Sequence, residues 1–294
     1  MRKKRAVGIL GLGIMGSAMA ANLMRAGFRV TGYDPLEACR RRHARAGGIV
    51  AKSAREAADS ASILISSLPS SKALESNSRI VSGRKIVVET STLPIKVKEQ
   101  ARRRLTKAGA TLLDCPLSGT GAQARAGDLV VFGSGSRAAY RRTLPVLKGF
   151  SRSQYYLGRF GNGSKMKFAA NLLVAIHNVS SAEAVILARR SGLPAALAVQ
   201  VLGDGAGASR MLQVRGPLMV RRRYLPATVT LETWRKDMKI IGEFVRGLGS
   251  PAPLFSATRA IYREAMAQGR AKQDTAAVCA VLERRARPSK RGAK

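Results

Sequence analysis

Three glycines near the start of the chain have the spacing of a phosphate-binding turn. Gly11, Gly13 and Gly16 form the pattern G-x-G-x-x-G directly after an apolar run at residues 6–10. In such a turn the first glycine permits a tight bend, the second lets a pyrophosphate approach the backbone, and the third lets the next helix pack on the strand. The helix N-terminus then offers free N–H groups to the anion. The pattern predicts a dinucleotide-binding turn formed by Gly11, Leu12, Gly13, Ile14, Met15 and Gly16.

The same segment also fits a second interpretation, a secretory signal peptide. It combines a basic cluster at residues 2–5, an apolar run and an Ala-Met-Ala sequence at residues 18–20. Asp34 favours the dinucleotide turn, because an acidic residue about 20 positions further on is expected to accept hydrogen bonds from the cofactor ribose. We therefore expect NAD as the cofactor, with NADP possible because basic residues at positions 40–42 follow Asp34 closely.

Lys167 and Asn171 form a second group that can do chemistry. They are four residues apart in an apolar helical pattern, so they share one face of a helix. Burial lowers the pKa of a lysine toward the range that suits general acid–base catalysis. From these residues alone two interpretations stay open: Lys167 is a catalytic acid–base group on the same face as Asn171, or it is a surface side chain that reaches solvent past its neighbours.

The elements that must position these residues follow an alternating order in the first half of the chain. Helical patterns at residues 17–26, 54–58, 96–107 and 137–147 lie between strand-like segments at residues 6–10, 29–33, 63–67, 86–89, 111–114 and 129–133. Alternating strands and helices predict an α/β fold with a mostly parallel sheet and helices on both of its faces. The first domain is therefore a Rossmann-type, NAD(P)-binding domain over residues 1–163.

The pattern changes near Ser164, after which no strand is predicted. Ser164 is expected to cap a long apolar helix that continues to about residue 191, before Gly192 and Pro194. Further helical patterns follow at residues 195–202, 235–248, 253–268 and 275–282. We predict an all-helical domain over residues 164–283, and a disordered basic tail over residues 284–294.

Charge raises an alternative function. The formal net charge is +35 and the isoelectric point is about 11.6, which suits a nucleic-acid-binding protein that uses an enzyme fold as a scaffold. The basic clusters at residues 40–42, 102–104, 141–142 and 221–223 contain no aromatic residue on which a base could stack. We expect them to be solvated faces of helices, and any binding of nucleic acid to be non-specific and salt-dependent.

The sequence gives little support to disulfide-rich, metal-binding or membrane-spanning classes of protein. Cys39, Cys115 and Cys279 are far apart, which excludes a disulfide framework and a cysteine-built zinc site and suits the reducing cytoplasm. The two histidines, His43 and His177, are too few for a histidine-based metal site, so no metal is expected. No stretch approaches the ~20 consecutive apolar residues of a membrane span.

Three motifs together resemble those of the β-hydroxyacid dehydrogenase family, which includes 3-hydroxyisobutyrate dehydrogenase and tartronate semialdehyde reductase. They are the glycine turn at residues 11–23, D-C-P-L-S-G-T-G-A-Q-A at residues 114–124, and G-N-G-S-K-M-K-F-A-A-N at residues 161–171. The sequence Lys236-Asp237-Met238 stands at the family's K-D-L, and the resemblance runs in order from about residue 5 to residue 282. It implies hydride transfer between a nicotinamide and a small hydroxy acid, or its semialdehyde or keto acid, with Lys167 as general acid and base.

The resemblance also implies further site residues and an oligomer. Ser118 and Gly119 are expected to bind the substrate carboxylate, together with Thr120 and Asn171, and Lys236 is expected at the cofactor. Thr120 stands where the family usually has glycine, so its side chain is expected to narrow or polarise the pocket. The resemblance further implies that the helical domain, residues 164–283, binds the substrate and assembles the chain into a homodimer or homotetramer. The residues that follow predicted strands, where open α/β sheets bind ligands, are also assigned to the cofactor: Leu68, Pro69, Ser91 and Thr92.

Overall fold

The computed structural model of the chain describes residues 5–286, which divide into two compact units. The first unit ends at Lys167 and the second begins at Phe168. Each unit has its own architecture.

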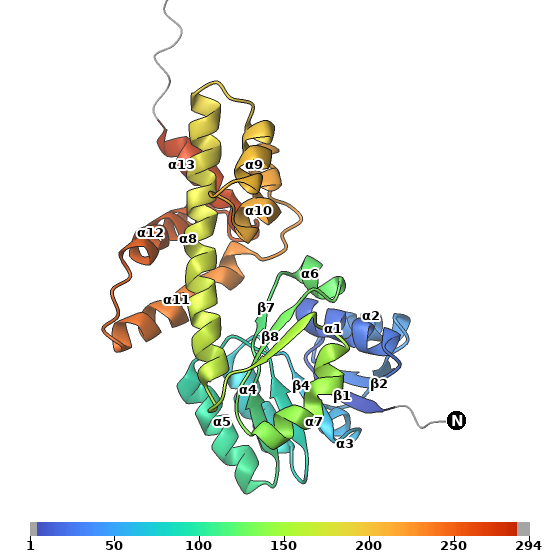
Figure 1. The fold of residues 1–294 in the computed structure, drawn as a ribbon. Coiled ribbons are helices and arrows are strands. Elements are labelled where there is room, and N and C mark those ends of the chain that lie inside the picture. Colours follow the sequence, from blue (N-terminus) through green and yellow to red (C-terminus); the bar gives the residue numbers. More distant parts are fainter. Residues whose placement is uncertain (1–4, 287–294) are drawn as a thin grey trace, which may run out of the picture. The chain divides into compact units, whose positions relative to one another are not determined.

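The first unit is built on a sheet of six parallel strands in the order β3-β2-β1-β4-β5-β6 (Figure 1). The strand order reverses between β1 and β4, and open α/β sheets bind their ligands at such a switch point. This confirms the predicted Rossmann-type sheet. The strands are β1 Ala6–Leu10, β2 Arg29–Tyr33, β3 Ile49–Val50, β4 Ile63–Ser66, β5 Ile86–Glu89 and β6 Thr111–Asp114.

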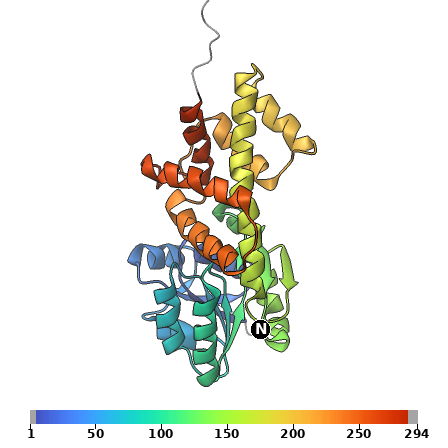
Figure 2. The same ribbon diagram turned by 90° about the vertical axis from the view of Figure 1, so that its left-hand side faces the viewer.

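Helices cover both faces of this sheet because successive strand residues point to opposite sides. Ile9 and Val88 belong to one buried core, to which α1 and α7 contribute, whereas Leu10 and Val87 belong to a second core with α3, α4 and α5. Helices α4 and α5 lie side by side in both views (Figure 1 and Figure 2). The bounds are α1 Ile14–Arg25, α2 Glu37–Arg45, α3 Ala54–Asp59, α4 Ser71–Ile80, α5 Ile95–Lys107 and α7 Arg137–Lys148.

A smaller three-stranded sheet completes the first unit. Strand β8, Val130–Gly133, pairs antiparallel with β7, Leu117–Ser118, and parallel with β9, Ser153–Tyr156. The short helix α6, Gly121–Arg125, lies between β7 and β8 in the chain. The sequence did not predict β3, β7 or β9, nor α2, α4 and α6. Two-residue strands such as β3 and β7 are too short to show a hydrophobic period.

The second unit is helical. Apart from an isolated bridge between Thr230 and Asp274, its described residues contain no strand, which confirms the predicted helical architecture. Helix α8 begins in the first unit and continues into the second without a break (Figure 1). The bounds are α8 Asn162–Arg190, α9 Ala195–Asp204, α10 Arg210–Val220, α11 Leu231–Gly247, α12 Pro253–Ala267, the 3-10 turn η1 Thr275–Ala277 and α13 Val278–Arg285.

Two details of this unit differ from the predictions. Helix α10 was not predicted, because Gly216 and Pro217 are adjacent residues that usually interrupt a helix. Gly216 has a packing reason, since a Cβ there would lie 2.8 Å from Cγ1 of Val199 on α9. Helix α13 continues to Arg285, beyond the predicted start of the basic tail at residue 284. The rest of that tail, residues 287–294, lies outside the described residues.

Helix α8 is the one helix in the described part of the chain that is long and apolar enough to cross a membrane by length and composition. Within the most apolar 18-residue stretch of α8, 39% is buried inside the structure. The core helix of a soluble protein meets the same criterion.

Candidate active site

The glycine turn between β1 and α1 has the geometry that its spacing predicts. Gly11 has a φ of +95° and donates its N–H to the Tyr33 carbonyl at 2.9 Å. A Cβ on Gly11 would lie 2.1 Å from the Ser67 carbonyl oxygen, and a Cβ on Gly16 would lie 1.9 Å from that of Gly11. Both positions therefore require glycine.

The backbone at Gly13 is open, in contrast to these two crowded positions. A Cβ on Gly13 would meet nothing within 4 Å. Gly13 is also the N-cap of α1, without a side-chain capping bond and without an acidic residue in the first turn of the helix. The free N–H groups at the start of α1, where Ile14 and Met15 follow Gly13, can therefore donate to an anion such as a pyrophosphate.

Asp34 lies directly after β2 and is bound to the glycine turn. Its Oδ2 accepts the Leu12 N–H at 2.8 Å and its Oδ1 accepts the Leu36 N–H at 2.9 Å. Arg40 donates to the Asp34 carbonyl at 2.7 Å, and Arg42 donates to the Leu12 carbonyl at 2.8 Å. The acidic residue and two guanidinium groups thus border the same turn, and the Asp34 carboxylate fixes the shape of that turn.

The loops after β4 and β5 meet the same edge of the sheet. Ser67 donates its N–H to the Leu10 carbonyl at 2.9 Å, and Leu68 donates its N–H to the Ser91 hydroxyl at 2.8 Å. Pro69 and Thr92 are the next residues of these two loops. The structure thus brings the predicted cofactor residues of the first unit together at the carboxyl ends of the strands.

Glu89 supports this edge and was not predicted as a site residue. It is fully buried at the end of β5, where its carboxylate accepts the Ser66 hydroxyl and, at 2.7 Å, the Ser91 N–H. Ser91 in turn receives the Leu68 N–H, so Glu89 orders two loops. An acidic residue at the end of an otherwise apolar strand is the signal that could have indicated it.

Ser118, Gly119 and Thr120 form the turn between β7 and α6. Gly119 has a φ of +139°, and a Cβ there would lie 2.6 Å from Leu129 Cδ2. The hydroxyl of Thr120 caps α6 by accepting the Gln123 N–H, and the Gln123 side chain accepts the Thr120 N–H at 3.0 Å. This capping box gives Thr120 a local structural role in addition to the expected one in the pocket.

Lys167 lies near the start of α8 and is only 9% exposed, whereas Lys165, two residues earlier, is exposed. Gly161 precedes the helix with a φ of +93°. Gly163 packs so tightly that a Cβ would lie 2.2 Å from the Phe132 carbonyl oxygen. The two glycines of the third motif therefore allow the helix to begin against the sheet.

Ser164 does not cap α8 as predicted, because the helix begins at Asn162. Ser164 instead lies in the first turn, where its N–H and its hydroxyl both donate to the Asp114 carboxylate, at 2.7 and 2.8 Å. The capping acceptor comes from the end of β6, far away in the sequence, and local sequence cannot reveal it.

Asn171 and Lys236 are connected in the second unit through Asp237. Asn171 Nδ2 donates to Asp237 Oδ2 at 3.1 Å, and Lys236 Nζ lies 3.6 Å from Asp237 Oδ1. The side chains of Lys236 and Asp237 are 36% and 13% exposed, so this ion pair is partly buried. Asp237 belongs with the predicted residues and was missed.

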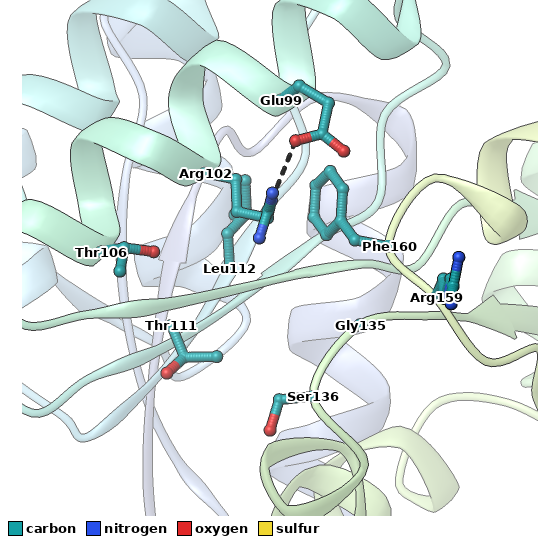
Figure 3. A pocket seen from close by; sticks show the side chains of 9 residues that line it. All are labelled: Glu99, Arg102, Thr106, Thr111, Leu112, Gly135, Ser136, Arg159 and Phe160. Atoms are coloured by element: carbon teal, nitrogen blue, oxygen red, sulfur yellow. Dashed lines mark hydrogen bonds and ion pairs between the residues drawn. The ribbon is translucent and has the colours of Figure 1, made fainter.

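A cavity of about 500 Å³ in the first unit lies away from these residues. It is bordered by Thr111, which begins β6, and by Arg102, Ser136, Arg159 and Phe160 among others (Figure 3). Figure 3 shows Arg102 paired with Glu99 at its rim. None of the predicted site residues lines this cavity, which lies at the amino end of β6.

His43 and the three cysteines are buried titratable side chains outside the predicted site. His43 is buried, and desolvation lowers its pKa below the usual 6.5. Cys39, Cys115 and Cys279 are buried free thiols. Over residues 5–286 no group of three or more metal-ligating side chains is found. The basic clusters of the sequence are mostly exposed, with Arg40 and Arg104 half-buried.

Comparison with known proteins agrees with this geometry. Residues 6–158 match the family described as the NAD binding domain of 6-phosphogluconate dehydrogenase, and residues 161–282 match that described as NAD-binding of NADP-dependent 3-hydroxyisobutyrate dehydrogenase. An L-threonate dehydrogenase from Cupriavidus necator is 30% identical over 95% of this chain and 96% of its own. The mitochondrial 3-hydroxyisobutyrate dehydrogenase of the mouse is 29% identical over 95% of this chain and 87% of its own. A crystal structure of 3-hydroxyisobutyrate dehydrogenase from Salmonella typhimurium has a TM-score of 0.86 at 28% identity, covering 95% of this chain and all of that one.

A dinucleotide turn on a Rossmann-type sheet, followed by a helical unit with this long helix, defines an NAD(P)-dependent oxidoreductase acting on CH–OH groups. The chain belongs to the β-hydroxyacid dehydrogenase family. The relatives quoted are named as dehydrogenases, so they give no support to the alternative of a nucleic-acid-binding scaffold.

Proposed function

We propose that the protein oxidises a small hydroxy acid, or reduces the corresponding semialdehyde or keto acid, with Lys167 as general base and general acid. The observation that carries this proposal is the burial of Lys167 in the third motif, beside an exposed Lys165 that shares the same helix. The nicotinamide, when bound, supplies the acceptor or donor of hydride.

In the oxidative direction the neutral amine of Lys167 takes the hydroxyl proton while the C–H hydride leaves the same carbon, so that a C=O bond forms. In reduction the ammonium returns that proton to the developing alkoxide. The cation stabilises a negative charge that is larger in the transition state than in the ground state, and this difference makes the interaction catalytic.

The other site residues are proposed to bind and orient the substrate and the cofactor. Ser118 and Gly119, with Thr120 holding their turn, are proposed to bind the substrate carboxylate, and Asn171, held by Asp237, is proposed to contact the substrate or Lys167. The glycine turn, Asp34, the loops of Leu68 and Ser91, and Lys236 are proposed to hold the cofactor.

The names of relatives suggest which substrates to test. They include an NAD-dependent L-serine dehydrogenase from Pseudomonas aeruginosa and a 2-hydroxy-3-oxopropionate reductase from Escherichia coli. We would assay L-threonate, L-serine and 3-hydroxyisobutyrate with NAD and with NADP, and 2-hydroxy-3-oxopropionate, succinic semialdehyde and glyoxylate with NADH and with NADPH. Turnover of at least one pair is expected. Binding of NADH without turnover of any pair would contradict the proposal.

We also propose that the chain forms a homodimer or homotetramer through its helical unit. Leu187 and Leu193 are 70% and 58% exposed, Leu197 and Val201 are 53% and 60% exposed, and α9 buries none of its residues within the chain. A second copy is the occupant that family resemblance suggests. Light scattering is expected to give at least twice the chain mass of 31.4 kDa, and a monomer at micromolar concentration would contradict this.

A cytoplasmic location is proposed as well. The three cysteines are buried as free thiols, and burial raises the pKa of the Cys115 thiol and raises that of Cys279 to about 11. Such thiols persist in a reducing compartment. Fractionation of cells that produce the protein tests the location, and recovery from a membrane or secreted fraction would contradict it.

A further inference from the structure

A buried ion pair lies directly beneath the first turn of α8. Lys98 of α5 and Asp114 at the end of β6 both have completely buried side chains, and Lys98 Nζ lies 2.8 Å from Asp114 Oδ1. The same carboxylate accepts the N–H and the hydroxyl of Ser164. All of these groups belong to the first unit.

A neighbouring serine extends the cluster. The Ser134 hydroxyl accepts the Gly163 N–H at 3.0 Å, and it also lies 3.1 Å from the Asp114 carbonyl oxygen. Asp114 and Ser134 thus bind two consecutive N–H groups of the first helical turn. These are among the N–H groups that a helix cannot satisfy itself.

The carboxylate is well placed for a helix of 29 residues, because negative charge at a helix N-terminus is favoured by the helix dipole. A fully buried carboxylate is nevertheless costly unless a cation compensates it. Lys98 supplies that cation. Without it the charged Asp114 would have to move toward water, and this displacement would break its bonds to Ser164.

Ser164 and Lys167 are three residues apart, so they lie on adjacent turns of one helical face. We propose that Lys98 is a positioning residue: its ion pair with Asp114 fixes the first turn of α8 and thereby places Lys167. The proposal rests on the proposed role of Lys167. Lys98 itself is completely buried on α5 and acts through Asp114 and the helix.

The sequence contains a signal for this role. On α5 the buried positions are Lys98, Ala101 and Leu105, which have the spacing of the apolar face of a helix. A lysine on that face must have a buried partner, whereas its neighbours Lys96 and Arg102 are exposed.

The test compares Lys98→Met with the double variant Lys98→Met/Asp114→Asn. The first leaves a buried carboxylate without its cation, whereas the second removes both charges and keeps an acceptor for the Ser164 N–H. For Lys98→Met we expect kcat with the best substrate of the panel to fall by roughly 100-fold, the scale for a misplaced catalytic group. KM and the NADH dissociation constant should stay close to wild type, and the double variant should recover most of the lost kcat.

Hydrogen exchange supplies a readout that does not depend on activity. Amides of residues 163–167 should lose protection in Lys98→Met and regain it in the double variant. Should the wild type turn over none of the panel, the proposed function fails, and exchange still decides whether Lys98 fixes the turn. Unchanged exchange and kcat in Lys98→Met, or a double variant no better than the single one, would overturn the proposal.

Two further comparisons separate positioning from general stability. Arg215 and Asp274 form an equally buried ion pair in the second unit, so Arg215→Met should lower the melting temperature without changing exchange at residues 163–167. If Lys98→Met does not fold, Ser164→Ala removes only one hydroxyl and should still lower kcat. Ser151→Ala, which removes a buried hydroxyl outside the cluster, should not. Equal effects of the two serine variants would contradict the proposal.

Discussion

Lys167 and Lys165 provide a matched pair of lysines on one helix. One is buried and the other is exposed, and they are two residues apart, so they face different directions. We expect Lys167→Ala to lower kcat by roughly two to four orders of magnitude, the scale for a positioned acid–base group, while NADH quenching titrations give a near-normal affinity. Lys165→Ala serves as the control with wild-type kcat. A wild-type kcat in Lys167→Ala would contradict the assignment of Lys167 as the catalytic residue.

Asp34 makes a prediction about cofactor choice. Its carboxylate should accept the adenosine ribose hydroxyls and repel a 2′-phosphate, so kcat/KM should be higher with NAD than with NADP. Asp34→Asn keeps an acceptor for the Leu12 N–H and removes the charge, so it should raise the NADP-to-NAD ratio. Asp59→Asn, at an exposed carboxylate that pairs with Lys85, should leave the ratio unchanged. If kcat/KM of the wild-type protein were higher with NADP than with NAD, the proposed role of Asp34 would be wrong.

The glycine turn allows fold and cofactor binding to be separated at the scale of an element. Gly16→Ala forces a Cβ against the Gly11 carbonyl, so it should lower the melting temperature and abolish NADH binding. Gly13→Ala enters open space, so it should weaken NADH binding with little change in melting temperature. Gly203→Ala, also in open space but on α9, is the control for both measurements. Equal loss of stability at Gly13 and Gly16 would contradict this division.

His43 predicts how the first unit responds to acid. Burial lowers its pKa below 6.5 in the folded state, so the unfolded chain binds the proton first and stability falls as the pH drops below that value. His43→Gln should reduce the loss of unfolding free energy between about pH 7.5 and about pH 5.5. Urea denaturation at the two pH values measures it. An unchanged difference would show that other groups cause the pH dependence.

Elements with a local signal were predicted well, and those with distant causes were not. The apolar strands β1, β4 and β5 and the glycine turn can each be recognised from a pattern of a few residues. Lys98 pairs with Asp114, 16 residues away, and Glu89 accepts a hydrogen bond from Ser66, 23 residues away. The sequence therefore shows these charged residues without their distant partners. Helix α10 was missed for a similar reason, because the neighbour that requires Gly216 lies on α9.

At the scale of the whole molecule the dominant feature is the charge of +35. Most of the basic clusters are exposed, and like charges on one compact chain repel each other. Added salt screens this repulsion, so the melting temperature should rise between about 0.05 and about 0.5 M sodium chloride. Differential scanning calorimetry measures the change. A melting temperature that falls with salt would show that attractive pairs outweigh the repulsion.

The continuous helix α8 restricts how the two units can be exchanged by recombination or by protein engineering. The border between the units, Lys167 and Phe168, lies inside a helix rather than in a linker. Lys167 remains with the dinucleotide unit, while Asn171, one turn later, remains with the helical unit. A gene fusion that exchanges either unit at this border must therefore preserve the helical register, because inserting or deleting one residue would rotate one side chain away from the other by about 100°. Recombination between relatives is thus expected to succeed with crossovers outside α8 and to fail with length changes inside it.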